Sequence, residues 1–275
     1  MKNFGILTDV TLCIGCESCV TACKNANNTG EDLPWRWKRD ITDLSAERWT
    51  TILRKDNHYI RKQCRHCLEP ACVSACLVGA LQKTPEGPVI YDGDICMGCR
   101  YCMMSCPFDI PRYLWSASIP YVRKCIMCND LIKSGELQQP ACTSSCPVNA
   151  TIFGDRDELL SIAKKRIEDN PGKYISKVYG ESEVGGTSVM YISDIELDFL
   201  GWKKNLGQKP LPQNTWMHLK KVPWLFGSVG ILMGGVWWII ERRMKLQGFD
   251  ESDTEKINPQ VESDDEIEKN EKREL

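Results

Sequence analysis

The longest apolar stretch of the chain covers residues 222–240, which read VPWLFGSVGILMGGVWWII and include no charged residue. At about 1.5 Å per residue, a helix of this length extends about 28 Å, close to the roughly 30 Å of a bilayer's hydrocarbon core. Trp224 stands near one end and Trp237 and Trp238 near the other, as in the aromatic belts of spanning helices. Because the stretch is apolar all round, it predicts a single transmembrane helix rather than a buried core helix.

Weaker patterns predict the remaining elements. Residues 155–170, DRDELLSIAKKRIEDN, carry an apolar stripe at helical spacing, with acidic N-cap candidates before it and Pro171-Gly172 after it. Short strand-like runs occur at residues 88–91, 151–153 and 188–193. We therefore expect a cover helix and an extended arm over residues 155–221. The charged stretch 241–275 is expected to be a disordered tail, because it has little apolar area to bury.

Cysteine supplies the most informative pattern, with sixteen residues in a chain of 275, all before residue 147. They fall into four groups of four and none is left over. The groups are Cys13, Cys16, Cys19 and Cys23; Cys64, Cys67, Cys72 and Cys76; Cys96, Cys99, Cys102 and Cys106; Cys125, Cys128, Cys142 and Cys146. This asymmetry predicts a metal-binding domain over residues 1–154.

The spacing within the groups indicates what the thiols hold. The third group ends in Pro107 and follows the C-x2-C-x2-C-x3-C-P run that binds [4Fe-4S] clusters. Cysteines spaced by two residues cannot pair among themselves as disulfides, which need Cα atoms about 4.4–6.8 Å apart and opposed Cβ vectors. Zinc sites use paired CxxC motifs and have no need of the third cysteine. The pattern predicts four [4Fe-4S] clusters and no [3Fe-4S] cluster, with a scaffold that binds zinc through sets of four cysteines as the alternative.

Residues 5–195 resemble the four-cluster iron–sulfur subunits of membrane-bound oxidoreductases. This family includes the β subunits of formate dehydrogenase and the iron–sulfur subunit of uptake nickel–iron hydrogenase. The motifs that carry the resemblance are DVTLCIGCESCVTACK, QCRHCLEPACVSAC, GDICMGCRYCMMSCPFDIPRY, KCIMCNDLIKSGELQQPACTSSCPVNATIFGDRDEL and GGTSVMYIS. The implied fold is α+β, with two ferredoxin-like double-cluster units followed by the transmembrane helix.

The resemblance also implies crossed ligation, in which the first group pairs with the fourth and the second with the third. The implied ligand sets are Cys13, Cys16, Cys19 and Cys146; Cys23, Cys125, Cys128 and Cys142; Cys64, Cys67, Cys72 and Cys106; Cys76, Cys96, Cys99 and Cys102. The spacing alone shows only that each group gives its fourth cysteine to a partner group. Pairing of neighbouring groups along the chain therefore remains the alternative.

The expected function is electron transfer rather than catalysis, because a cluster held by four cysteines has no open position for a substrate. The chain has no GxGxxG, P-loop or nucleophile elbow, and its three histidines are too scattered for a catalytic metal site. Four basic residues near the ligands are candidates for tuning cluster potentials, with solvated surface charge as the alternative reading. They are Arg65, His66, Arg100 and Lys124.

The resemblance implies two protein partners. One is a catalytic oxidoreductase subunit carrying molybdopterin or nickel–iron, and the other is a quinone- or haem-bearing membrane subunit that contacts the helix at residues 222–240. The GxxxG face formed by Gly230 and Gly234 suits such a contact. The net charge of −2 argues against nucleic acid. The run WRWKRD at 35–40, together with Trp49, suits a protein interface or ordinary core packing.

The expected location is the cell membrane, as a single-pass protein in contact with the lipid bilayer. Lysines and arginines flank both ends of residues 222–240, so the positive-inside rule does not decide the orientation. No export signal is visible in the first ten residues, MKNFGILTDV. In the resembling formate dehydrogenases the catalytic partner's signal carries the iron–sulfur subunit across the membrane. The resemblance thus favours a periplasmic cluster domain, and a cytoplasmic one stays open.

Overall fold

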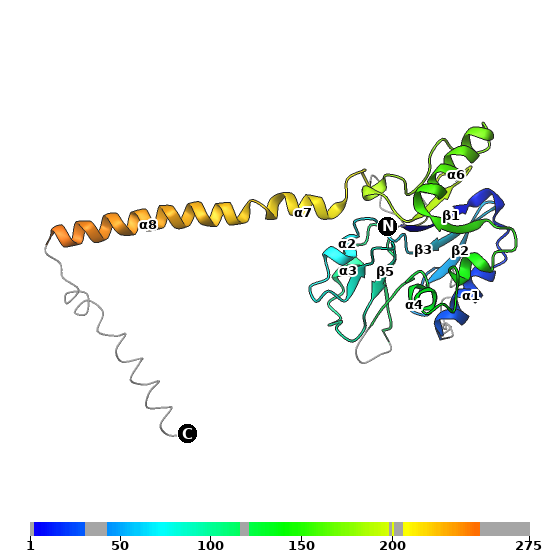
Figure 1. The fold of residues 1–275 in the computed structure, drawn as a ribbon, viewed down its shortest axis with the longest axis horizontal. Helices are drawn as coiled ribbons and strands as arrows, with labels where there is room; N and C mark the ends of the chain where they lie inside the picture. Colours follow the sequence, from blue (N-terminus) through cyan, green and yellow to red (C-terminus); the bar gives the residue numbers. More distant parts are fainter. Residues whose placement is uncertain (1–2, 31–42, 116–120, 198–199, 201–205, 248–275) are drawn as a thin grey trace, which may run out of the picture. The chain divides into compact units, whose positions relative to one another are not determined.

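The computed structural model describes residues 3–30, 43–115, 121–197, 200 and 206–247 (Figure 1). Its contacts divide the chain into two units, Met1–Thr215 and Trp216–Leu275, and all sixteen cysteines belong to the first unit. The predictions for residues 35–40 and for the tail beyond residue 247 lie outside the described residues.

A three-stranded sheet forms the centre of the first unit. Strand β1 (Phe4–Asp9) pairs with β8 (Thr151–Asp155) in antiparallel orientation and with β9 (Val189–Ile192) in parallel orientation, in the order β8-β1-β9. Neighbouring residues of these strands enter different apolar clusters, as the alternation of a strand requires. Ile6 packs with Tyr191 in one cluster, whereas Leu7 packs with Met190 and Ile192 in the other.

Helix α6 (Arg156–Asp169) covers one face of this sheet (Figure 1). Its first turn begins where the sequence predicted, since the Asp155 side chain accepts hydrogen bonds from the backbone N–H groups of Asp157 (3.0 Å) and Glu158 (3.4 Å). Leu159 and Ala163 face the sheet and are almost fully buried. The predicted helix is therefore confirmed in its position and its N-cap.

The three predicted strand runs are confirmed as β5 (Val89–Tyr91), β8 and β9. The run at residues 188–193 was expected within an extended arm over the cluster core. It instead supplies β9, whose four residues are all buried in the central sheet. The sequence cannot reveal this role, because β9 pairs with a strand at the opposite end of the domain.

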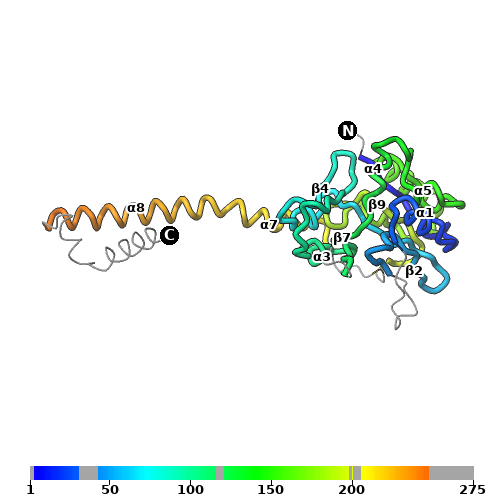
Figure 2. Tube along the Cα trace, turned by 90° about the horizontal axis from the view of Figure 1, so that it is seen from below, coloured from blue at the N-terminus to red at the C-terminus, as the bar shows by residue number. Residues whose placement is uncertain are grey.

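Short elements connect the cysteine groups. The hairpins are β2 (Thr50–Lys55) with β3 (His58–Gln63), β4 (Leu81–Lys83) with β5, and β6 (Arg112–Tyr113) with β7 (Val122–Arg123). The helices are α1 (Ser18–Asn27), α2 (Ala71–Ser74), α3 (Tyr101–Ser105), α4 (Asn129–Lys133) and α5 (Ala141–Ser144), with 3-10 turns η1 (Val10–Leu12) and η2 (Glu183–Gly185). Helix α1 contacts α5, as Figure 2 shows, and α2 contacts α3. The fold is thus a mixture of short helices and strands.

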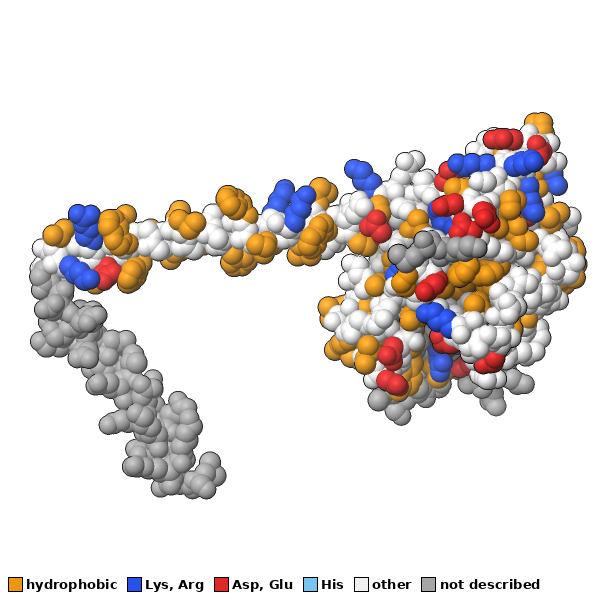
Figure 3. Space-filling view, viewed as in Figure 1, with side chains coloured by type: hydrophobic (Ala, Val, Ile, Leu, Met, Phe, Trp, Pro, Cys, Tyr) orange, Lys and Arg blue, Asp and Glu red, His pale blue; other side chains and the backbone are white. Residues whose placement is uncertain are grey.

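The second unit contains one long helix, α8 (Val222–Leu246), which follows α7 (Leu211–Leu219). No described residue of α8 is buried, and its apolar side chains lie between charged ones near the two ends (Figure 3). Residues Leu211–Leu246 contain the one described segment long and apolar enough to cross a membrane. The helix does not stop at residue 240. It continues to Leu246, helped by an ion pair between Lys245 and Glu241 (2.7 Å).

Candidate metal centres

All four cysteine groups share one backbone turn. In each CxxC pair the residue before the second cysteine has a left-handed conformation, with φ of 70° at Gly15, 46° at His66, 72° at Gly98 and 59° at Met127. Successive backbone N–H groups in such turns form concave nests that suit anions and iron–sulfur clusters. The glycines signal this turn in the sequence. His66 and Met127 give no such signal, so the turn at these two positions was not predicted from the sequence.

The first cavity lies between the first and fourth groups. It is lined by Cys13, Cys16, Cys19 and Cys146, with Arg61 beside them, and its volume is about 380 Å³ when the adjoining open solvent is included. We call these four cysteines site 1. Cys146 is more than a hundred positions from the others in sequence, yet it completes the same cavity.

A second cavity of about 290 Å³ lies between the second and third groups. It is lined by Cys76, Cys96, Cys99 and Cys102, which we call site 4. Two tyrosines, Tyr91 and Tyr113, share this lining. The hydroxyl of Tyr113 lies 3.6 Å from the Sγ atom of Cys102.

The registers of two strand pairs explain both cavities. Thr8 of β1 faces Thr151 of β8, and Cys13 follows the first by five residues while Cys146 precedes the second by five. Leu81 of β4 faces Tyr91 of β5, and Cys76 and Cys96 lie five residues before and after them. An antiparallel pair brings such equivalent positions together. The same construction therefore occurs twice in the domain.

The remaining cysteines form two sets whose thiols act on one another electrostatically. The thiol of Cys125 is influenced by Cys23, Cys128 and Cys142, which together with it we call site 2, and also by Cys64 of the second group. Cys67 lies close to Cys64, Cys72 and Cys106, which we call site 3. The described His, Cys, Asp and Glu side chains form no group of three or more that could hold a single metal ion.

Burial is the main influence on these thiols. Burial, with smaller upward contributions from neighbouring sulfurs, raises the pKa of Cys72 to about 12 and the pKa values of Cys19 and Cys106 to about 11. A buried set of thiolates is unfavourable without a positive centre among them. A cationic iron–sulfide core would supply that charge, so the donor set, the cavities and the turns all fit [4Fe-4S] clusters.

Three of the four predicted tuning residues are buried. Arg65, His66 and Lys124 are each at most 3% exposed, so the surface-charge reading is wrong for them. Arg100 is exposed and stacks over Trp115, with 4.5 Å from its guanidinium carbon to the ring centre. Sequence reasoning missed Arg61, the buried arginine beside site 1.

Their contacts explain how these buried groups are held. Arg65 lies between the rings of Phe108 (5.2 Å) and Tyr191 (4.6 Å). Lys124 donates to the carbonyl oxygens of Val89 (2.5 Å) and Cys125 (3.0 Å). The Nδ1 atom of His66 accepts a hydrogen bond from Val89 N–H at 2.9 Å. Burial, then the charges of nearby lysines, holds the pKa of His66 well below its usual value.

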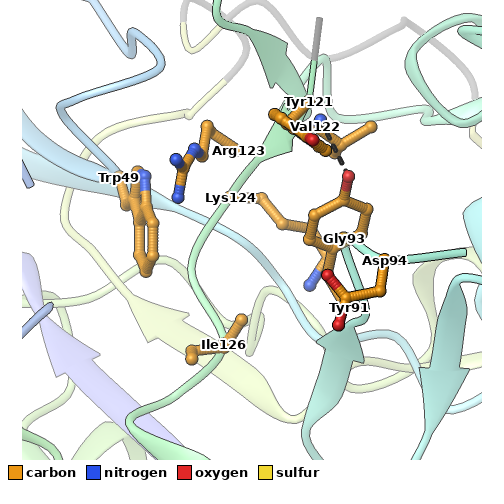
Figure 4. Close-up of a pocket in the computed structure, with 9 residues that line it drawn as sticks. All are labelled: Trp49, Tyr91, Gly93, Asp94, Tyr121, Val122, Arg123, Lys124 and Ile126. Carbon is orange, nitrogen blue, oxygen red and sulfur yellow. Dashed lines mark hydrogen bonds between the residues drawn. The ribbon is translucent and has the colours of Figure 1, made fainter. Parts of the chain in front are cut away.

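Another pocket in the described part of the chain contains no cysteine. Figure 4 shows Trp49 and Arg123 on one side of it and Tyr91 and Asp94 on the other. The Tyr91 hydroxyl accepts a hydrogen bond from the backbone N–H of Val122 at 3.3 Å. Trp49 is partly buried against the core around site 3, so it belongs at least in part to the packing. The other tryptophans expected at an interface, Trp35 and Trp37, lie outside the described residues.

Known proteins resemble this chain over most of its length. Residues 55–156 match the family model of the 4Fe-4S dicluster domain. The chain is 41% identical over 267 residues to a protein of Nitratidesulfovibrio vulgaris, covering 92% of this chain and 71% of that protein. It is 37% identical over 242 residues to the hydrogenase-2 operon protein HybA of Escherichia coli O157:H7, covering 74% of this chain and 73% of HybA. It is 36% identical over 199 residues to the iron-sulfur subunit of the nitrate-inducible formate dehydrogenase of Escherichia coli K12, covering 68% of this chain and 66% of that subunit.

Proposed function

Because this chain belongs to the family of [4Fe-4S] iron–sulfur subunits found in hydrogenase and formate dehydrogenase complexes, we propose that it conducts electrons through four clusters between a catalytic subunit and a membrane subunit. The family confirms the resemblance predicted from the motifs, and it removes the zinc scaffold as an alternative. When bound, a [4Fe-4S] cluster takes up and releases one electron. With four cysteines on each cluster, the chain itself is not a catalyst.

The observation that carries the proposal is the lining of the two cavities by cysteines from distant groups. We propose sites 1 to 4 as the four ligand sets, grouped in two ferredoxin-like double-cluster units. Sites 1 and 2 share one unit, with β1, β8, α1 and α5, and sites 3 and 4 share the other, with β4, β5, α2 and α3. The position of Cys146 in the cavity of Cys13 and Cys16 supports crossed ligation over pairing of neighbouring groups.

Contacts between the sets support an order along which electrons move. Cys19 of site 1 and Cys142 of site 2 belong to one packing cluster, and Cys125 of site 2 belongs to another with Cys64 of site 3. Cys72 of site 3 in turn lies close to Cys102 of site 4. These pairs arrange the sites in the sequence 1, 2, 3, 4.

The two ends of this series reach the surface through apolar residues. At site 1, Cys16 is exposed and Ile14 is 57% exposed. At site 4, Leu77, Met97 and Met104 are 70%, 61% and 74% exposed. Apolar rims of this kind suit protein interfaces. They support electron exchange with partner subunits at sites 1 and 4.

We assign the membrane subunit to site 4 and the catalytic subunit, of the molybdopterin or nickel–iron type, to site 1. The chain leaves the first unit at α7, where Leu211 packs with the core around site 3 and Gln213 donates a hydrogen bond to Glu69 (3.1 Å). Site 3 thus lies beside the start of the segment that leads to α8, and site 4 belongs to the same proposed double-cluster unit. We propose that α8 anchors the protein in the cell membrane and contacts a quinone- or haem-bearing subunit, with the cluster domain on the periplasmic side.

Cysteine substitutions in the complex test the ligand sets. The wild-type chain should contain about sixteen iron atoms and an equal amount of acid-labile sulfide. In electron paramagnetic resonance (EPR) spectra of the reduced complex, Cys146→Ser should alter the same signal as Cys16→Ser. Pairing of neighbouring groups requires instead that Cys146→Ser alter the same signal as Cys99→Ser. That result would refute crossed ligation while leaving the four-cluster content intact.

Truncation tests the anchor. A chain ending at Thr215, the last residue of the first unit, should appear in the soluble fraction after cell breakage. A chain ending at residue 247, which keeps α8, should stay with the membranes. Retention of the shorter chain in washed membranes without a partner subunit would contradict the role of α8.

A further inference from the structure

A buried arginine that the ligand sets leave unexplained lies between sites 1 and 2. Arg61 is in β3 and is 2% exposed. Its backbone oxygen accepts a hydrogen bond from the Tyr191 hydroxyl at 2.8 Å, which fixes the strand. None of its three side-chain nitrogens has a nitrogen or oxygen hydrogen-bond partner among the described residues. A guanidinium buried without compensation is strongly unfavourable, so this position calls for a negative partner.

Sulfur atoms surround this arginine from both sites. Its side chain lines the cavity of site 1. Burial alone would lower the pKa of Arg61, but the sulfurs of Cys142 and Cys19, the Tyr191 hydroxyl and a hydrogen bond to the Cys142 sulfur together raise it. In return, the arginine charge opposes the upward effect of burial on the pKa values of Cys13 and Cys23. The guanidinium therefore acts on two cysteines of site 1 and two of site 2.

We propose that Arg61 is a buried counter-cation shared by the clusters of sites 1 and 2, and that it raises the reduction potentials of both. The inference rests on the proposed ligand sets. A cluster held by four thiolates is anionic and becomes more negative by one charge on reduction. A fixed cation stabilises the reduced form more than the oxidised form, so the potential rises. Arginine suits this position because it stays protonated when buried.

The surroundings of the other two sites differ. Near site 3 there are two buried cations, Arg65, which stacks on the rings of Phe108 and Tyr191, and Lys124, which is bound to backbone carbonyl oxygens that share its charge. At site 4 the polar groups beside the cysteines are the hydroxyls of Tyr91 and Tyr113. Removal of Arg61 should consequently lower the reduction potentials of the clusters at sites 1 and 2 and leave those at sites 3 and 4 unchanged. This selectivity separates a role in potential from a general loss of packing.

Redox titration of the detergent-solubilised complex, followed by EPR, tests the inference. Arg61→Gln removes the charge, and Arg54→Gln is the matched control, an exposed arginine on the neighbouring strand β2. In Arg61→Gln, the ratio of oxidised to reduced cluster at a fixed potential should rise at least tenfold for two clusters. This corresponds to a fall of at least about 59 mV for a one-electron couple. The other two clusters, and all four in the control, should not shift.

The outcomes separate this inference from the proposed function. A wild-type complex without iron and labile sulfide would refute the function and the inference together. A fully loaded Arg61→Gln complex with four unchanged potentials would overturn the inference alone. If Arg61→Gln fails to retain iron, Arg61→Lys and Arg61→Met decide. Retention of iron by Arg61→Lys but not by Arg61→Met supports a role for the positive charge. Equal iron retention by the two variants overturns that role.

Discussion

Substitution of Gly15 by alanine should destabilise the cluster domain more than its small size suggests. Gly15 lies between Cys13 and Cys16 with φ of +70°, and a Cβ atom there would come within 2.4–2.7 Å of three ring atoms of Tyr59. The left-handed conformation costs a non-glycine residue about 1–2 kcal/mol. Displacement of the packed ring adds about 1–3 kcal/mol. We expect Gly15→Ala to lower the free energy of unfolding by about 2–5 kcal/mol.

Gly79→Ala is a matched control. Gly79 has the same φ of +70°, but a Cβ atom there would have no described neighbour within 4 Å. Only the conformational cost of about 1–2 kcal/mol applies to it. The structure itself shows that this cost is tolerated at a cluster site, because His66 and Met127 adopt the equivalent left-handed turn. The ring of Tyr59 should therefore account for the difference between the two variants.

A double-mutant cycle measures that contact. Anaerobic urea unfolding, at matched iron content, gives the free energies of Gly15→Ala, Tyr59→Ala and the double variant. With the ring removed, Gly15→Ala should cost only about 1–2 kcal/mol, which leaves a coupling energy of about 1–3 kcal/mol. If Gly15→Ala costs no more than Gly79→Ala, or if the coupling energy is zero, the reasoning from the close contact is wrong.

Three further predictions concern other parts of the chain. Asp155→Ala removes the N-cap of α6 and should lower the free energy of unfolding by about 1 kcal/mol in urea titrations. Asp155→Asn, which can still cap the helix, should retain most of the wild-type stability. Burial alone would raise the pKa of Glu183, but a lysine and a backbone N–H bonded to its carboxylate hold that pKa below the ordinary 4.5. The ionised Glu183 therefore stabilises the fold above about pH 4.5, and this stabilisation is lost as pH falls below that value. Glu183→Gln should be less stable than the wild type at pH 7 and should lose less stability on acidification. Identical pH profiles of the two proteins would contradict this. Gly230→Leu with Gly234→Leu should weaken copurification with the membrane subunit, whereas Gly235→Leu, on another face of α8, should not; equal yields would argue against the GxxxG contact.

Local signals in the sequence predicted the elements that depend on neighbouring residues. The cysteine spacing predicted the cluster chemistry, and the stripe after Asp155 predicted α6 with its cap. Long-range pairing was beyond the sequence, so the place of β9 in the central sheet was not predicted. Arg61 was missed because it stands in a polar run, HYIRKQ, that gives no sign of burial in the sequence. It is buried where its side chain meets Cys19 of α1 and Cys142 of α5, residues far from it in sequence.

The repeated construction of the two cavities has an uneven cost in chain entropy. The pair β4–β5 joins Leu81 to Tyr91 across a local hairpin, whereas β1–β8 joins Thr8 to Thr151, 143 residues apart. Loop closure costs about 0.6 kcal/mol more for each doubling of length, so the longer closure costs about 2 kcal/mol more. Local contacts also form faster, so the hairpin beside site 4 should form before the sheet beside site 1. Among the described strands, only β1–β8 gains a third strand, β9, and it is α6 that covers the resulting sheet. The apolar contacts that β9 and α6 add to this sheet offset the entropy cost of the long loop closure that brings Cys13 and Cys146 together.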